Sequence, residues 1–140
     1  MAMKDSIKIK SSGNDYELEL SNPRPPGLNY PVEYIQVSIK GHDIAASSSD
    51  VYLYQPHDLA RFFDEVAADC NGRDGEKEWA SIEDDFCLVC KSDRIGHIEF
   101  KVTLKSGPYA EDWKMEIIIH VDARQIEEIA KQVREFLHLN

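Results

Sequence analysis

Apolar and polar residues alternate along five segments of this 140-residue chain, and this alternation limits the fold more than any other feature. The segments are residues 7–9, 16–20, 35–39, 98–104 and 113–121. Successive side chains of a strand point to opposite faces of a sheet, so each segment is predicted to be a strand with one buried face. Short runs rich in apolar residues at 44–46, 51–54, 79–82 and 86–90 are predicted to add further strands.

Two other segments have the helical spacing of apolar residues. In the first, Pro56 suits the first turn, Asn71-Gly72 is a typical stop, and the apolar stripe consists of Leu59, Phe62, Phe63, Val66, Ala67 and Cys70. In the second, Asp122 and Gln125 have the spacing of a capping box. Its apolar stripe consists of Ile126, Ile129, Ala130, Val133, Phe136 and Leu137.

The order of these elements is strands, helix, strands, helix, which favours an α+β fold over a βαβ repeat. We therefore predict a single, mostly antiparallel β-sheet of about six to eight strands, with two amphipathic helices packed on one face. A chain of this length fits one domain, so residues 1–140 are predicted to form a single α+β domain.

The chain is acidic, with a net charge of −10 from 26 acidic and 16 basic residues. Nucleic acids and anionic membranes require a basic surface, so neither is an expected partner, whereas a basic protein is. No apolar run approaches the roughly 20 residues of a membrane span, and the charged N-terminus does not resemble a secretory signal. Together with three cysteines, an odd number, these features predict a cytoplasmic protein with reduced thiols.

Sequence motifs for catalysis, metals or cofactors are missing. Cys87 and Cys90 form a C-x-x-C, but they lie on a predicted strand, where positions three apart face opposite ways. No histidine pair has metal-ligand spacing, no serine sits in a nucleophile elbow, and the glycines form no phosphate loop. We therefore predict no catalytic residue, no metal and no cofactor.

Acidic residues are concentrated between Asp58 and Asp85, where ten acidic and three basic residues give a net charge of −7. Such a surface beside a tryptophan could attract and anchor a basic protein. A solvated helix face and loop would have the same composition, and that interpretation stays open. The candidate partner-binding residues are Asp64, Glu65, Asp69, Trp79, Glu83, Asp84 and Asp85.

A family resemblance rests on elements in the C-terminal two thirds of the chain. These are the double phenylalanine Phe62-Phe63, the segment Trp79-Ala80-Ser81-Ile82-Glu83, Gly96-His97-Ile98 at a strand start, Asp112-Trp113, and the final helix from Gln125 to Leu137. With them the chain resembles a small bacterial domain family close in pattern to the WapI-type immunity proteins of contact-dependent toxin systems. The resemblance implies a cytoplasmic protein, without catalytic residues, that binds and neutralises a cognate toxin domain. Many such toxins are basic nucleases.

Two alternatives stay open at this level. One is an enzyme of unrecognised type, with a site near His97, Glu83 and Trp79. The other is a structural or regulatory module that dimerises through an open sheet face or an edge strand, which exposed Tyr52, Tyr54 and Ile118 would favour. The sequence is compatible with either a monomer or a homodimer.

Overall fold

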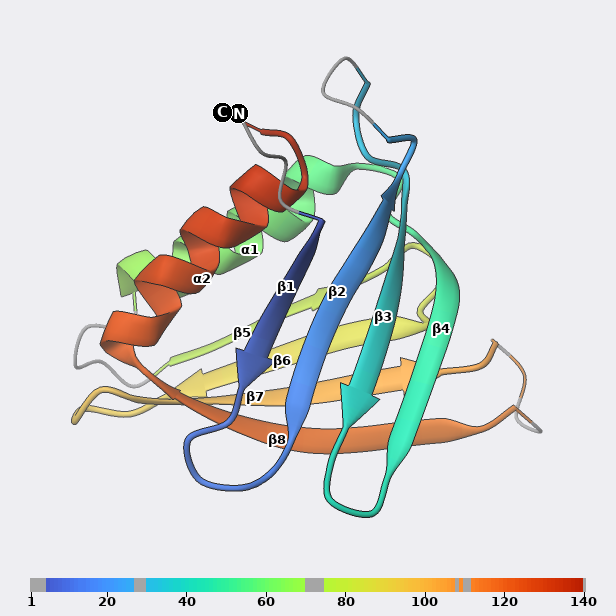
Figure 1. Ribbon diagram of the computed structural model, residues 1–140. Coiled ribbons are helices and arrows are strands. Elements are labelled where there is room, and N and C mark those ends of the chain that lie inside the picture. Colours follow the sequence, from blue (N-terminus) through green and yellow to red (C-terminus); the bar gives the residue numbers. More distant parts are fainter. Residues whose placement is uncertain (1–4, 27–29, 70–74, 108, 110–111, 140) are drawn as a thin grey trace.

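Two antiparallel sheets, each followed in the chain by one helix, make up the computed structural model (Figure 1). The structure describes residues 5–26, 30–69, 75–107, 109 and 112–139. Within these residues, the first sheet has the order β1-β2-β3-β4 and the second β5-β6-β7-β8. The elements are β1 (Ser6–Lys10), β2 (Glu17–Arg24), β3 (Tyr34–Lys40), β4 (Ala45–Tyr52), α1 (Pro56–Asp69), β5 (Gly75–Ala80), β6 (Phe86–Ser92), β7 (His97–Lys105), β8 (Lys114–Asp122) and α2 (Ala123–Phe136).

The prediction of an α+β fold with antiparallel strands and two helices is confirmed, but the prediction of one sheet is wrong. In the described residues, β4 and β5 do not pair, and α1 carries the chain from one four-stranded sheet to the other. Eight strands with one apolar face each present more surface than two helices of 14 residues are able to cover. Each sheet instead covers the apolar face of the other. The predicted end of the first helix, including Cys70 and Asn71-Gly72, lies outside the described residues.

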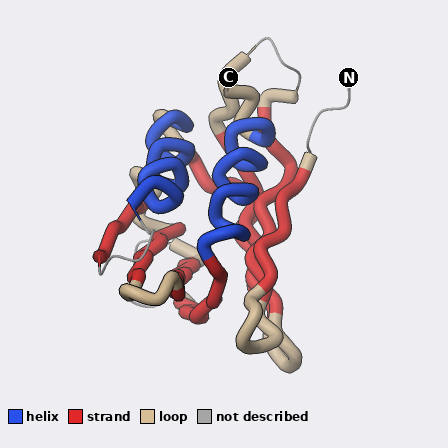
Figure 2. Tube along the Cα trace, turned by 90° about the vertical axis from the view of Figure 1, so that its left-hand side faces the viewer, coloured by secondary structure: helices blue, strands red, loops and turns tan. Residues whose placement is uncertain are grey.

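The core lies between the two sheets and is closed on one side by the helices. Side chains from both sheets and both helices belong to one hydrophobic cluster. Figures 1 and 2 show α1 and α2 side by side, with α1 next to β5 and α2 next to β1. Phe63 of α1 is 1% exposed, and its ring centroid lies 5.9 Å from that of Phe100 on β7. The helices therefore fill the space along the β1 and β5 edges of the two sheets.

The edge of β8 is covered by the loop between β1 and β2. Asn14 donates from Nδ2 to the carbonyl of Ile118 (3.0 Å), and the backbone N–H of Ser12 donates to the carbonyl of His120 (2.9 Å). The hydroxyl of Ser11 accepts the N–H of His120. Ile118 is half-buried. These bonds occupy backbone groups that an uncovered edge strand would offer to another chain.

The predicted capping box of the second helix is confirmed. The carboxylate of Asp122 accepts the N–H groups of Arg124 and Gln125 (both 2.9 Å), and the Gln125 side chain accepts the N–H of Asp122 (2.9 Å). Because β8 ends at Asp122 and α2 begins at Ala123, the box fixes the turn from strand to helix within one residue.

Phe63 provides a test of this core. Phe63→Ala removes a ring that contacts both Phe62 and Phe100, and we expect the free energy of unfolding to fall by about 3–5 kcal/mol. Urea unfolding followed by circular dichroism measures the change. Arg61→Ala is the matched control on the same helix, since its side chain is 65% exposed, and it should change stability by less than about 0.5 kcal/mol. Equal effects of the two variants would contradict this description of the core.

Candidate functional site

The predicted acidic residues of α1 face basic side chains of the same fold. Asp64 forms an ion pair with Arg134 of α2, which links the two helices. Glu65 and Asp69 lie 4.0 and 2.8 Å from the ammonium of Lys77 on β5. The side chains of Glu65 and Asp69 are still 53% and 52% exposed. These acids therefore link α1 to α2 and β5 through ion pairs, while Glu65 and Asp69 keep carboxylate oxygens in contact with solvent.

Asp84 and Asp85 are part of the turn between β5 and β6. The Asp85 side chain is buried and accepts a hydrogen bond from the Ser81 hydroxyl (2.6 Å), which in turn accepts the N–H groups of Asp85 and Phe86. Asp84 has a left-handed backbone (φ 61°) and forms an ion pair with Lys105 at 2.9 Å. The hydrogen bond from Lys105 lowers the pKa of the Asp84 carboxyl. Glu83 and Asp84 are both exposed, but Asp84 is paired with Lys105, whereas no ion pair is found for Glu83 among the described residues.

Trp79 packs into the structure and does not project as an anchor. Its ring contacts Phe86 edge-to-face with the centroids 5.4 Å apart, and it is half-buried against the hydrophobic cluster. The seven predicted residues are therefore divided. Asp64, Glu65 and Asp69 lie on α1 beside Lys77, whereas Glu83 and its two neighbours lie past the other end of β5.

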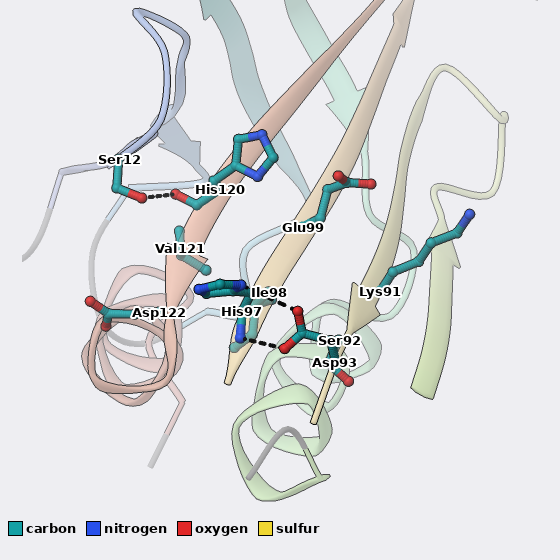
Figure 3. Close-up of a pocket in the computed structure, with 10 residues that line it drawn as sticks. All are labelled: Ser12, Lys91, Ser92, Asp93, His97, Ile98, Glu99, His120, Val121 and Asp122. Carbon is teal, nitrogen blue, oxygen red and sulfur yellow. Dashed lines mark hydrogen bonds and ion pairs between the residues drawn. The ribbon is translucent and has the colours of Figure 1, made fainter. Parts of the chain in front are cut away.

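A surface hollow lies at the opposite end of the second sheet (Figure 3). It has a volume of about 490 Å³. Its lining comes from the β1–β2 loop, from the end of β6 and its following turn, and from β7 and β8. The lining residues are Ser12, Lys91, Ser92, Asp93, His97, Ile98, Glu99, His120, Val121 and Asp122.

Asp93 and His97 face each other in this hollow. The Nδ1 atom of His97 lies 3.2 Å from Oδ2 of Asp93, while Oδ1 of Asp93 accepts the N–H groups of Ile95 (2.9 Å) and His97 (3.0 Å). The hydrogen bond from the backbone N–H of His97 is the main reason that the pKa of the Asp93 carboxyl is lowered. A carboxylate on Nδ1 fixes the orientation of an imidazole, as in many catalytic sites. Here the same carboxylate also closes the turn at Gly96, which has a φ of 84°.

The other polar groups of the hollow do not converge on His97. Figure 3 shows that the His120 ring and the Asp122 carboxylate point away from the His97 ring. In the part of the chain that the structure describes, no group of three or more histidine, cysteine or acidic side chains is placed to hold a metal ion. Sequence reasoning singled out His97 but missed Asp93, whose position four residues earlier at a strand turn was the available signal.

The structure does not bring together His97, Glu83 and Trp79, the residues of the alternative enzyme site. Glu83 lies in the turn before β6 and His97 follows the turn after it, so the length of β6 (Phe86–Ser92) separates them. Seven strand residues span about 20 Å, which is far beyond hydrogen-bond reach. An acid–base pair of His97 and Glu83 is therefore not formed by this fold.

Cys87 and Cys90 lie on opposite faces of β6, as the strand pattern predicts. Cys90 is 2% exposed and belongs to the core, whereas Cys87 lies on the other side, where its sulfur donates to Oδ1 of Asp84 (3.2 Å). Burial, followed by the hydrogen bond to Asp84, raises the pKa of the Cys87 thiol to about 11. A thiol in this state is a poor nucleophile near neutral pH.

The fold and its surfaces define an acidic two-sheet α+β protein with an Asp93–His97 pair in a surface hollow. The chain belongs to a family of unknown function, DUF6228, whose model matches residues 9–140. No curated protein and no solved structure matches the sequence. No described helix is long and apolar enough to cross a membrane. No activity is assigned to this family, so the immunity-type role implied by the resemblance stays a prediction.

The environment of Cys87 predicts slow alkylation. A pKa of about 11 in place of 9.0 leaves about 100-fold less thiolate at any pH below 9, so iodoacetamide should modify Cys87 far more slowly than a free thiol. Asp84→Asn removes a nearby negative charge and should speed the reaction at pH 8. Tandem mass spectrometry separates Cys87 from Cys90. An unchanged rate in Asp84→Asn would contradict the contribution of Asp84.

Proposed function

We propose that this chain is a cytoplasmic binding protein of the immunity type, which neutralises a basic toxin domain through its acidic surface. The observation that carries the proposal is the arrangement around Lys77. Glu65 and Asp69 of α1 lie 4.0 and 2.8 Å from its ammonium. Two carboxylates, each about half exposed, thus share one lysine, and the excess negative charge faces solvent.

The electrostatics of this arrangement suit a basic partner. Glu65 and Asp69 share one half-buried ammonium, so an arriving arginine or lysine can pair with either carboxylate without leaving a buried charge alone. The net charge of −10 adds a long-range attraction that accelerates encounter with a cation-rich surface. The resemblance to WapI-type immunity proteins supplies the kind of partner, a toxin domain.

The divergent polar groups around the His97 hollow also support binding over catalysis. A general base is effective when a nucleophile or substrate proton lies within hydrogen-bond reach. In Figure 3 the His120 ring and the Asp122 carboxylate point away from the His97 ring, and Asp93 is the acid directed at it. The Asp93 carboxylate also closes the β6–β7 turn by accepting the backbone N–H groups of Ile95 and His97.

Charge reversal tests this proposal. Glu65→Lys combined with Asp69→Lys should reduce affinity for the toxin domain encoded next to the gene by at least about tenfold, and should abolish rescue of growth on co-expression. Isothermal titration calorimetry at two salt concentrations measures the affinity and its electrostatic share.

The matched control is Asp15→Lys combined with Asp43→Lys, which changes the net charge equally at exposed positions of hairpin loops. This control should keep both affinity and rescue. A toxin that kills equally with and without the wild-type chain would disprove the immunity role. Equal loss in both double variants would show that net charge alone, and not the α1–β5 surface, governs binding.

A further inference from the structure

Three tyrosines, two exposed and one half-buried, form a row on the outer face of the first sheet, and neither the fold nor the acidic surface of α1 accounts for them. The row consists of Tyr34 on β3, Tyr52 on β4 and Tyr54 just after β4. Tyr34 and Tyr54 are 39% and 57% exposed. The ring centroids of Tyr34 and Tyr52 are 5.1 Å apart, and those of Tyr52 and Tyr54 are 6.2 Å apart. Tyrosine is enriched in protein interfaces because its ring offers a large contact area with little conformational freedom to lose.

The tyrosine row is held in place by the backbone. Tyr34 and Tyr52 are direct partners across the β3–β4 ladder, so their rings support each other. Tyr54 has a φ of 58°, which is unusual for a bulky side chain. The N–H of Leu53 donates to the carbonyl of Glu33 (2.8 Å) immediately before it, and α1 begins at Pro56 two residues later. The rings are thus presented in a fixed arrangement, which reduces the entropy lost on binding.

One end of the row already holds a guanidinium group of the same chain. The Cζ atom of Arg24 lies 5.9 Å from the Tyr34 ring centroid. Its Nη1 donates to Oδ1 of Asp50 at 2.5 Å, and its Nη2 donates to the carbonyl of Ser49. An aromatic face combined with a carboxylate and a carbonyl is the environment that guanidinium groups prefer. This surface therefore already binds one arginine side chain, that of Arg24 in the same chain.

The region beside the row is acidic. Ser48 to Asp50 of β4, two residues before Tyr52, line a cavity of about 320 Å³ together with Glu83, Asp85, Ser106 and Gly107. This lining contains three carboxylates and no basic residue. Asp50 is 67% exposed, and Glu83 makes no ion pair within the described part of the chain. The cavity therefore adds negative potential next to the rings.

We propose that the tyrosine row, with Glu83, is a docking surface for an arginine-bearing segment of a protein partner. An arginine of the partner stacks on Tyr54 or Tyr52 and directs its guanidinium to the exposed Glu83 carboxylate, because Asp50 already holds Arg24 and Asp85 is buried. The choice of a basic partner rests on the proposed function. The location does not, because Glu65 and Asp69 lie in the last turns of α1, about 15–20 Å along the helix from its start beside Tyr54.

A peptide titration tests the surface without the toxin. The probe is a capped peptide of alternating arginine and glycine, compared with the same peptide carrying lysine or glutamate instead. Chemical shifts of the tyrosine rings and of the backbone amides are followed by NMR at low salt. We expect the arginine peptide to shift Tyr34, Tyr52 and Tyr54, and the glutamate peptide to leave them unchanged. Tyr54→Ala and Glu83→Gln should each weaken binding by about fivefold.

Ile95→Ala is the control, since Ile95 is 79% exposed and lies in the turn at the other end of the second sheet. It should bind the arginine peptide as the wild type does. Shifts confined to Glu65–Glu78, or equal affinity in Tyr54→Ala, would overturn the proposal. Shifts of the tyrosine row that depend on protein concentration alone would assign the surface to a second copy of this chain and would also overturn it.

The toxin experiment separates this proposal from the proposed function. If Tyr54→Ala binds the toxin normally while the Glu65/Asp69 double variant loses it, the row is not the docking surface and the immunity role stands. If the wild-type chain fails to bind the toxin, the immunity role fails, and the peptide titration still decides whether the row recognises arginine.

Discussion

Burial of two apolar sheet faces against each other is the constraint on which the rest of this structure depends. Ile35, Val37 and Ile39 of the first sheet and Val102 and Ile119 of the second are fully buried. Neither sheet is stable in water with that face exposed, because each buried aliphatic side chain contributes about 1.5–3 kcal/mol. Once the faces meet, only the sides of the assembly stay open. The two helices and the β1–β2 loop take their positions along the edges of β1, β5 and β8.

The alternation of apolar residues placed the five strands in which it is regular, and the apolar stripes placed both helices. Where alternation was absent the prediction was partly wrong: residues 44–46 and 51–54 belong to one strand, β4 (Ala45–Tyr52), and β5 is Gly75–Ala80 instead of 79–82. Alternation was not sufficient to count the sheets, because it tells which face is buried and not which strand is the neighbour. The pairing of β8 with the loop at Ser11 to Asn14 joins positions more than 100 residues apart, which no local pattern encodes. Asp93 was overlooked for a related reason, since its function becomes visible only when the turn brings it onto His97.

The acidic residues clustered between Asp58 and Asp85 fall into two groups, those that stabilise the fold and those that are open to solvent. Asp85 and Asp84 are bound into a turn by Ser81 and Lys105, and Asp64 joins α1 to α2 through Arg134. Asp85, which is buried and hydrogen-bonded, has little left to offer to a partner. The acids with exposed oxygens are the smaller set that matters for recognition. A count of charges along the chain does not separate these two sets, whereas the geometry of their neighbours does.

The fold leaves the proposed docking surface beside the β4 edge uncovered. The apolar side of β4 is committed to the core at Val51, and its outer side carries serines and Tyr52, so this part of the sheet needs no cover for stability. Exposed rings there gain nothing from folding beyond their contacts with each other and with Arg24. Because Tyr34 and Tyr54 keep much of their surface in solvent, the row has apolar area left for contact with another molecule, which is the basis of the proposed docking surface.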